Sequence, residues 1–438
     1  MLVYKILKIL GKYYRIVAIN GCRTLRPLWE EWKKEIEINR FLLDSFNGFI
    51  SMIWEGEIAM GSDQKRIGMA LSGGGIRATI FHLGVLKWMA ENDMLGDIVR
   101  ISSVSGASLC IGLIYSYSNH AWPTSKQYLT NVLPKIQKTI LENDIQIAAL
   151  IRLAISPWWW NRKVNLVAKI MQEKWGISGN LSELQNSPTW YVNCTTFESG
   201  KRFIFSKKAM GDYQVGYVRN PEFALADAMA SSAGFPILIG PYKMRTDIYS
   251  WVKSAKYGKE WVGSKNKFLH LWDGGVYDNL GLESVYKMDD GGCLVKDINY
   301  LIVSNASGGS GYKKRKYGLS AGNLKRLLEI SMDQVGALRN RSVVDYIERN
   351  KNGLYFNIGN SAEKITKCSR ISRETKEDLI THCMSEADAA KVRNYPTTLR
   401  TPSKTDFDLI LQHGYEVAKC TYISHESVEA GLLSNEKA

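Results

Sequence analysis

The sequence has no run of about 18 consecutive apolar residues, which is close to the length that a helix needs to cross a bilayer. It therefore predicts no membrane-spanning helix. The seven cysteines are scattered and never form a C-x-x-C pair. This pattern argues against a disulfide framework and a cysteine-rich zinc site, and it predicts free, mostly buried thiols in a reducing compartment. We predict no metal ion and no cofactor.

Acidic residues are fewer than basic ones. The 438 residues include 43 Asp and Glu against 57 Lys and Arg, so the formal net charge is +14. Hydrophobic residues make up 45% and charged residues 23%, which excludes a wholly disordered chain. The charge indicates an anionic partner, either nucleic acid or a membrane surface. No nucleic-acid motif is present and the basic residues accompany apolar stretches, so we predict an anionic membrane surface and no nucleic acid.

The first 29 residues contain no acidic residue. Lys5, Lys8 and Lys12 recur three and four residues apart, and apolar residues recur on another side, which predicts a basic amphipathic helix within a segment of residues 1–65. The lysines interrupt the apolar run and no small-residue cleavage site follows, so no export signal is predicted. Two interpretations remain open. The helix either lies on an anionic membrane or packs its apolar side on the rest of the protein.

From residue 67 onward, strand patterns alternate with helical ones. Strands are predicted at 67–71, 98–104, 189–195, 202–206, 267–272 and 299–305, and helices near 78–91 and 106–117. Strands separated by helices predict an α/β fold with a mostly parallel central sheet. We assign residues 66–310 to the core of the protein, with a helical insertion at 119–188 that is a candidate lid. Residues 311–438 form a predicted helical C-terminal extension packed on that core.

Three consecutive glycines, Gly73, Gly74 and Gly75, follow the first predicted strand. Such a turn lets backbone N–H groups point into one concavity at a helix N-terminus, which suits an anion or an oxyanion. The same residues fit the dinucleotide pattern G-x-G-x-x-A. That pattern also needs an acidic residue at the end of the second strand, where this chain has serines. We therefore predict no nicotinamide cofactor.

A serine, Ser105, stands between the second strand and the next helix, which is the geometry of a nucleophile elbow. Ser103 and Ala107 replace the outer glycines of the G-x-S-x-G pattern. Asp273 follows the strand 267–272 and could reach the same sheet edge, although Asp-Gly-Gly also fits a simple turn. None of the six histidines lies in a loop suited to a catalytic triad.

Together these segments resemble the patatin-like phospholipase family. The family's three marks, in its order, read SGGGIR (72–77), SVSGAS (103–108) and DGG (273–275). The longer segments DGGVYDNLGLES (273–284) and DQVGALRNR (333–341) are similar to a bacterial branch. The resemblance implies a patatin-like three-layer α/β fold.

The resemblance also implies a role for each matching residue. Ser105 is the implied nucleophile and Asp273 its general base, a dyad without histidine. Gly74 and Gly75 are expected to donate backbone N–H bonds to the oxyanion. Gly73 is expected to shape the turn, and Arg77 is expected to help position the loop.

The implied activity is hydrolysis of fatty-acyl esters of phospholipids through an acyl-enzyme, in the cytoplasm at the inner face of the membrane. One alternative is an esterase or thioesterase for a soluble acyl substrate. Another is a catalytically silent binding protein, because the methyl group of Ala107 could crowd the elbow. The family includes regulated members, and no residue identifies a regulatory ligand here.

A route for lipid is predicted within residues 145–163. The helix there is almost entirely apolar, and it ends at a proline followed by three tryptophans, Trp158, Trp159 and Trp160, beside two basic residues. Tryptophan next to basic residues is typical of a membrane-interface anchor. The alternative is a buried helical cap over the active site, with the tryptophans in its core.

Overall fold

The computed structural model describes residues 64–236, 239–253, 266–288, 291–308, 321–367 and 369–435. The residues from 65 onward form one structural unit. Lys5, Lys8 and Lys12 lie outside the described residues, so the prediction of an N-terminal amphipathic helix stays a prediction.

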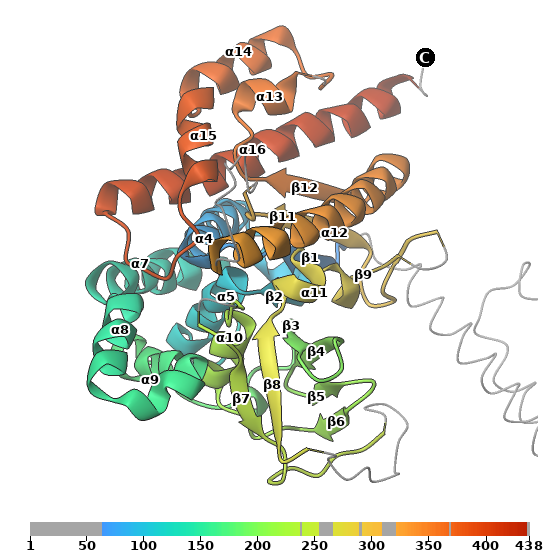
Figure 1. The fold of residues 1–438 in the computed structure, drawn as a ribbon. Helices are drawn as coiled ribbons and strands as arrows, with labels where there is room; N and C mark the ends of the chain where they lie inside the picture. The colour runs from blue at the N-terminus through green and yellow to red at the C-terminus, as the bar shows by residue number, and fades with distance from the viewer. Residues whose placement is uncertain are drawn as a thin grey trace, which may run out of the picture. The chain divides into compact units, whose positions relative to one another are not determined.

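Five parallel strands form one side of a ten-stranded sheet, with β12 (Gly353–Asn357) at its edge (Figure 1). Their spatial order is β12, β11 (Tyr300–Asn305), β1 (Ile67–Leu71), β2 (Ile98–Val104) and β3 (Thr189–Thr196). Antiparallel strands extend the sheet beyond β3, and they are β4 (Arg202–Phe205), β5 (Ala209–Asp212), β6 (Gly216–Arg219), β7 (Tyr242–Arg245) and β8 (Phe268–Asp273). The predicted α/β fold with a mostly parallel central sheet is confirmed.

Alternate residues of the central strands enter two different layers. On β1, Met69 and Leu71 belong to the main hydrophobic cluster, whereas Ala70 belongs to a second cluster. The main cluster is shared with α4 (Gly75–Glu91), α5 (Gly106–Tyr117), α10 (Leu225–Ser232) and α16 (Lys404–Asn435). The second is shared with α12 (Ala321–Asn350). Because a strand turns successive side chains to opposite faces, the sheet is covered on both and the predicted three layers are present.

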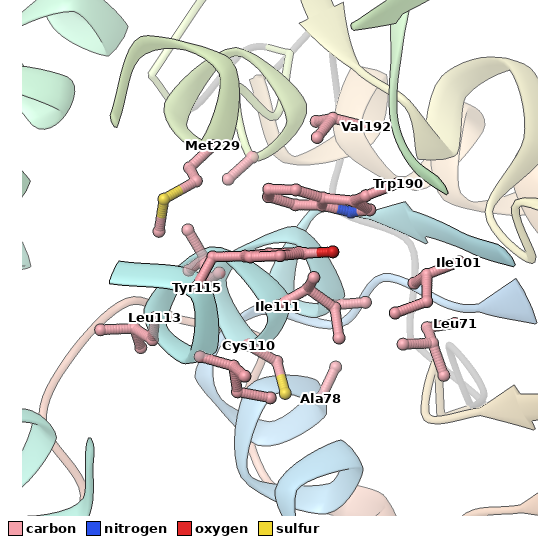
Figure 2. Packing of buried hydrophobic residues seen from close by; sticks show 14 of the residues in the cluster. Leu71, Ala78, Ile101, Cys110, Ile111, Leu113, Tyr115, Trp190, Val192 and Met229 are labelled. Atoms are coloured by element: carbon pink, nitrogen blue, oxygen red, sulfur yellow. The ribbon is translucent and has the colours of Figure 1, made fainter. Parts of the chain in front are cut away.

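Large side chains fill the space between the sheet and the helices of the main cluster. Trp190 of β3 stacks on Tyr115 of α5 with ring centroids 5.5 Å apart, and Leu71 and Ile101 lie beside them (Figure 2). This packing fixes the strands β1 and β2 from which the two candidate catalytic turns start.

Helix α16 crosses α4 at very short range. A Cβ atom at Gly84 would lie 2.0 Å from the carbonyl oxygen of Leu411, and one at Gly414 would lie 2.1 Å from that of Phe81. The two backbones approach this closely because both positions are glycine. The C-terminal helix therefore holds the helix that follows the glycine turn.

The segment 119–188 is helical, as predicted. Its elements are α6 (Ser125–Gln127), η3 (Tyr128–Val132), α7 (Leu133–Glu142), α8 (Ile145–Ile155), η4 (Pro157–Arg162), α9 (Lys163–Trp175) and η5 (Leu181–Glu183). None of the helices within the described ranges is long and apolar enough to cross a membrane.

The C-terminal part departs from its prediction in one place. It contains α12, α13 (Ala362–Thr366), α14 (Arg373–His382), α15 (Glu386–Asn394) and α16, but between α12 and α13 the strand β12 joins the sheet beside β11. The predicted helical C-terminal part is present, and it also contains this one strand of five residues, which was not predicted. Their sequence, GLYFN, is a short apolar run that acquires a strand partner only in three dimensions. The remaining small elements are η2 (Leu95–Asp97), α11 (Gly275–Asp278), η6 (Leu282–Ser284), β9 (Tyr286–Lys287) and β10 (Cys293–Leu294).

Candidate active site

Strand register brings Ser105 and Asp273 to the same point. At the end of β2, Val104 pairs with Asn193 of β3. The next residue of β3, Cys194, pairs with Asp273, the last residue of β8. Ser105 follows Val104 directly, so both candidate catalytic residues flank the same residue of β3. The prediction that Asp273 reaches the sheet edge next to the serine turn agrees with this geometry.

Ser105 occupies a strained turn between β2 and α5. Its φ of 52° and ψ of −119° are unusual for a residue with a side chain. Such a conformation costs free energy, and it persists where the surroundings hold it and where it presents a reactive group. The side chain is almost fully buried, with 8% of the residue exposed.

Ser232 at the end of α10 holds this turn. Its hydroxyl accepts the backbone N–H of Ser105 at 2.9 Å and donates to the carbonyl oxygen of Asn193 at 2.8 Å. Ser232 has no predicted role, since a serine in a small-residue helix carries no signal of a contact 127 residues away.

The Asp273 carboxyl group is buried, with 3% of the residue exposed. Burial raises its pKa to about 6, against the opposing effects of hydrogen bonds from the Gly275 N–H and the Ser105 side chain. The Gly275 bond measures 2.7 Å and orients the carboxylate. The residue is thus a buried carboxylate with a raised proton affinity next to the Ser105 side chain, and both properties suit a general base.

The glycine turn lies against the elbow. Gly74 and Gly75 have φ values of 149° and 62°, which favour glycine, and a Cβ at Gly73 would lie 3.0 Å from the Ser105 Cβ. The Gly73 N–H donates to the Asn279 carbonyl oxygen at 3.1 Å. No acceptor among the described residues is recorded for the N–H groups of Gly74 and Gly75. These two groups are the donors that a bound oxyanion could use.

The elbow and the glycine turn touch at Gly106. A Cβ at this position would lie 2.0 Å from the Gly75 carbonyl oxygen, and the Thr79 hydroxyl donates to the carbonyl oxygens of Gly75 and Gly106 at 3.2 and 2.8 Å. Ala107, in contrast, is fully buried in the main hydrophobic cluster. Gly106 therefore makes the close approach to the glycine turn. Ala107, which replaces the last glycine of the G-x-S-x-G pattern, does not make it.

The buried Arg77 tethers the glycine turn from behind. Its guanidinium donates to four backbone carbonyl oxygens, of Ala306, Ser307, Arg393 and Tyr395. Burial lowers its pKa to about 10, so it keeps its charge at neutral pH. The guanidinium thus contacts the backbone after β11 and at the end of α15, and not Ser105, which agrees with a positioning role rather than direct oxyanion binding.

The segment after α15 braces the same turn. The Thr398 carbonyl oxygen accepts the Ile76 N–H at 2.8 Å, and the Thr398 hydroxyl donates to the Gln146 side chain of α8 at 2.7 Å. On the other side, Arg339 of α12 forms ion pairs with Asp278 and Glu283, at 3.4 and 3.1 Å. These contacts could not be predicted from the sequence, because each joins residues far apart in the chain.

The three tryptophans differ in exposure. Trp158 and Trp160 are 81% and 60% exposed, whereas Trp159 is partly buried against the main cluster. Their exposed neighbours on α8 recur at helical spacing. We call the set the tryptophan face, and it consists of Ile147, Leu150, Ile151, Ile155, Trp158 and Trp160. The alternative of a buried cap with all three tryptophans in its core is wrong for two of them.

Comparison with known proteins gives one family match. Residues 69–286 match the family model of the patatin-like phospholipases, a stretch that includes all three segments of the site. The predicted resemblance to this family is confirmed, and the match supports a lipid hydrolase. Its bacterial branch stays a prediction. No match was found among curated proteins.

Solved structures with a similar arrangement include human GIVD cytosolic phospholipase A2, at 12% identity and a TM-score of 0.47 over 83% of this chain and 60% of that chain. The same human protein in complex with methyl gamma-linolenyl fluorophosphonate is 14% identical, with a TM-score of 0.46 over 86% and 60%. VipD from Legionella pneumophila is 12% identical, with a TM-score of 0.37 over 83% and 68%. The chain thus spans 60% of the length of the human enzyme's chain.

Proposed function

We propose that this protein is a serine lipid acyl hydrolase that cleaves fatty-acyl esters of phospholipids at a membrane surface. One observation carries the proposal. Ser105 has a strained backbone conformation and its side chain lies next to the buried Asp273 carboxyl, while the neighbouring N–H groups of Gly74 and Gly75 have no acceptor among the described residues. A nucleophile, a base and oxyanion donors meeting at one point are what acyl transfer requires. The family match supports the lipid substrate.

The first half of the reaction forms an acyl-enzyme. The Asp273 carboxylate takes the proton of the Ser105 hydroxyl while the serine oxygen attacks the ester carbonyl carbon. The resulting oxyanion accepts hydrogen bonds from the N–H groups of Gly74 and Gly75, each of which is expected to contribute about 100-fold or more in rate. Protonated Asp273 then gives its proton to the leaving alcohol oxygen, and the lysophospholipid departs.

The second half releases the fatty acid. Asp273 takes a proton from water, the hydroxide attacks the acyl carbonyl carbon, and the same backbone donors bind the second oxyanion. The bond to the Ser105 oxygen then breaks, and Asp273 returns the proton to it. No histidine takes part. His82 lies a few residues after the glycine turn in the sequence. Its ring is buried between the Ser72 carbonyl oxygen and the Ser304 hydroxyl, and burial lowers its pKa to about 4.

Gly106→Ala is expected to lower the rate of ester hydrolysis by roughly 100-fold or more, because moving reacting groups by about 1 Å costs that much. The added methyl group would meet the Gly75 carbonyl oxygen and push the glycine turn away from Ser105. Hydrolysis of p-nitrophenyl butyrate measures the effect. Gly96→Ala is the matched control, since no atom of the described residues, apart from those next to it in the chain, lies within 4 Å of its new Cβ. Equal rates for Gly106→Ala and wild type would contradict the proposed geometry.

Fatty-acid release from vesicles of phosphatidylglycerol and phosphatidylethanolamine tests the substrate class. Mass spectrometry should find one lysophospholipid for each fatty acid, because a single acyl ester is cleaved. Cleavage of p-nitrophenyl butyrate with no release from vesicles would favour the soluble-ester alternative.

The tryptophan face supports action at a membrane surface. It presents six exposed apolar side chains on α8 and η4, beside Arg162 and Lys163. Apolar side chains enter the boundary of a bilayer, and the flanking cations attract anionic lipids. Through Gln146, α8 also contacts the segment that braces the glycine turn. We place the protein in the cytoplasm at the inner face of the membrane, with Lys5, Lys8 and Lys12 as a second proposed contact.

The double variant Trp158→Ala/Trp160→Ala is expected to bind anionic vesicles at least about 100-fold more weakly, because burying one large apolar side chain contributes about 1.5–3 kcal/mol and two rings are lost. Vesicle co-sedimentation measures binding, and hydrolysis of p-nitrophenyl butyrate should stay unchanged.

The control for this experiment is Tyr213→Ala, which removes an aromatic ring that is 63% exposed in the turn between β5 and β6. It should bind vesicles like the wild type. If the tryptophan variant binds as strongly as wild type, or if Tyr213→Ala weakens binding equally, the tryptophan face is not the membrane contact.

A further inference from the structure

Two cysteine thiols meet in the C-terminal part, away from the candidate active site. The Sγ atoms of Cys383, at the end of α14, and Cys420, in the middle of α16, lie 3.6 Å apart. The sequence gives no sign of this pairing, because 37 positions separate the two residues. The other described cysteines are free and have no sulfur–sulfur contact among the described residues; they are Cys110, Cys194 and Cys293.

The surroundings favour reaction between these two sulfurs. Cys420 is 1% exposed within a small cluster formed with Ile371 and Leu379, whereas Cys383 is only partly buried at its edge. A small oxidant can therefore reach the Cys383 sulfur, whereas the Cys420 sulfur is buried next to it. The hydrogen bond from Cys420 and the positive charge of Lys419 hold the pKa of the Cys383 thiol below its ordinary value. A lower pKa increases the fraction present as the reactive thiolate.

We propose that Cys383 and Cys420 form a redox modification site that closes to a disulfide on exposure to a peroxide and reopens with a thiol reductant. The sulfurs need to approach by about 1.5 Å to reach the bond length of a disulfide. Cys383 lies where α14 ends, in extended backbone with φ of −104° and ψ of 167°, so it is outside a regular helix and can adjust.

The reaction balances in two steps. The Cys383 thiolate attacks one peroxide oxygen, the O–O bond breaks, and the departing hydroxide takes a proton to become water, which leaves a sulfenic acid. The Cys420 sulfur then attacks the Cys383 sulfur, the S–S bond forms, and the S–O bond breaks. The released hydroxide takes the Cys420 proton as a second water. Two thiols and one hydrogen peroxide thus give one disulfide and two waters.

The disulfide would stabilise the segment that braces the glycine turn. Residue 383 begins the connection to α15, whose C-terminal end supplies the Arg393 and Tyr395 carbonyl oxygens to Arg77. Cross-linking residue 383 to α16 restricts the unfolded chain and ties this segment to the helix that packs on α4. We expect the thermal midpoint to rise by roughly 5 °C on oxidation.

The experiment treats the full-length protein with hydrogen peroxide, blocks the remaining thiols by alkylation and digests it with trypsin. Peptides 377–391 and 420–437 each contain one cysteine. The expected product is the cross-linked pair of these peptides, with a mass two hydrogens below the sum of the two peptide masses. This product should disappear after treatment with dithiothreitol. The exposed Cys293 is the internal control for access of the oxidant.

Single variants separate the two roles. In Cys420→Ser, Cys383 should accumulate as a sulfenic acid that dimedone traps, and in Cys383→Ser the buried Cys420 should stay a thiol. Neither variant should gain thermal stability on oxidation. Oxidation of Cys293 without the cross-linked pair in the wild type would overturn the proposal. None of these measurements depends on hydrolase activity. The result therefore tests the redox site separately from the proposed function.

Discussion

Ser105→Ala is expected to lower fatty-acid release from anionic vesicles by at least about 10,000-fold, because loss of the nucleophile from a serine hydrolase removes nearly all of the catalytic rate. The hydroxyl is the only group lost, and the turn is held through the backbone N–H of residue 105, which alanine keeps. The thermal midpoint should therefore stay close to that of the wild type. Free fatty acid measured by mass spectrometry gives the rate, and thermal unfolding checks the fold.

Ser116→Ala is the matched control, since it removes a hydroxyl from the same helix, α5. That hydroxyl is buried and has no hydrogen-bond partner among the described residues, so full activity is expected. A fluorophosphonate probe adds an independent readout, because it should label the wild type and leave Ser105→Ala unlabelled. Release of fatty acid by Ser105→Ala at the wild-type rate would contradict the proposal that Ser105 is the nucleophile. A wild type that neither reacts with the probe nor releases fatty acid would instead favour the silent binding protein.

The local parts of the site could be predicted from the sequence. Three glycines after a strand, a serine between a strand and a helix, and an aspartate at a strand end are each visible within a few residues. Their conformations depend on neighbouring residues and on the pleat of the strand that precedes them. The strands β1, β2, β3 and β11 were predicted within about two residues for the same reason.

The supports of the site could not be predicted, because they come from distant segments. Ser232 and Thr398 contact the elbow and the glycine turn through a hydroxyl and a carbonyl oxygen, and neither carries a local pattern. Helix α12 shows a related limit. It lies within the predicted helical C-terminal extension, yet Leu324, Leu327 and Leu338 are at least half exposed. Periodicity identifies an apolar face, but it does not say whether protein covers that face.

Asp273→Asn is expected to lower the rate by about 1,000- to 10,000-fold, because asparagine fills the same space and cannot take the Ser105 proton. The wild type should also lose activity in acid. Burial raises the Asp273 pKa to about 6, so the carboxylate is the main form at pH 7 and is protonated below pH 6. The kcat/KM for p-nitrophenyl butyrate should therefore fall about tenfold per pH unit below pH 6 and level off above it. The residual rate of Asp273→Asn should lack this inflection.

A second carboxyl group makes the assignment of that inflection testable. Asp227 of α10 has a pKa that burial also raises to about 6, but its side chain bonds to Tyr242 and not to Ser105. Asp227→Asn should keep the acid limb of the wild-type profile, whereas Asp273→Asn should remove it. If Asp227→Asn flattens the profile and Asp273→Asn does not, the titrating group is Asp227. Asp273 is then not the base that activates Ser105, since a base must exchange its proton in the step that the profile reports.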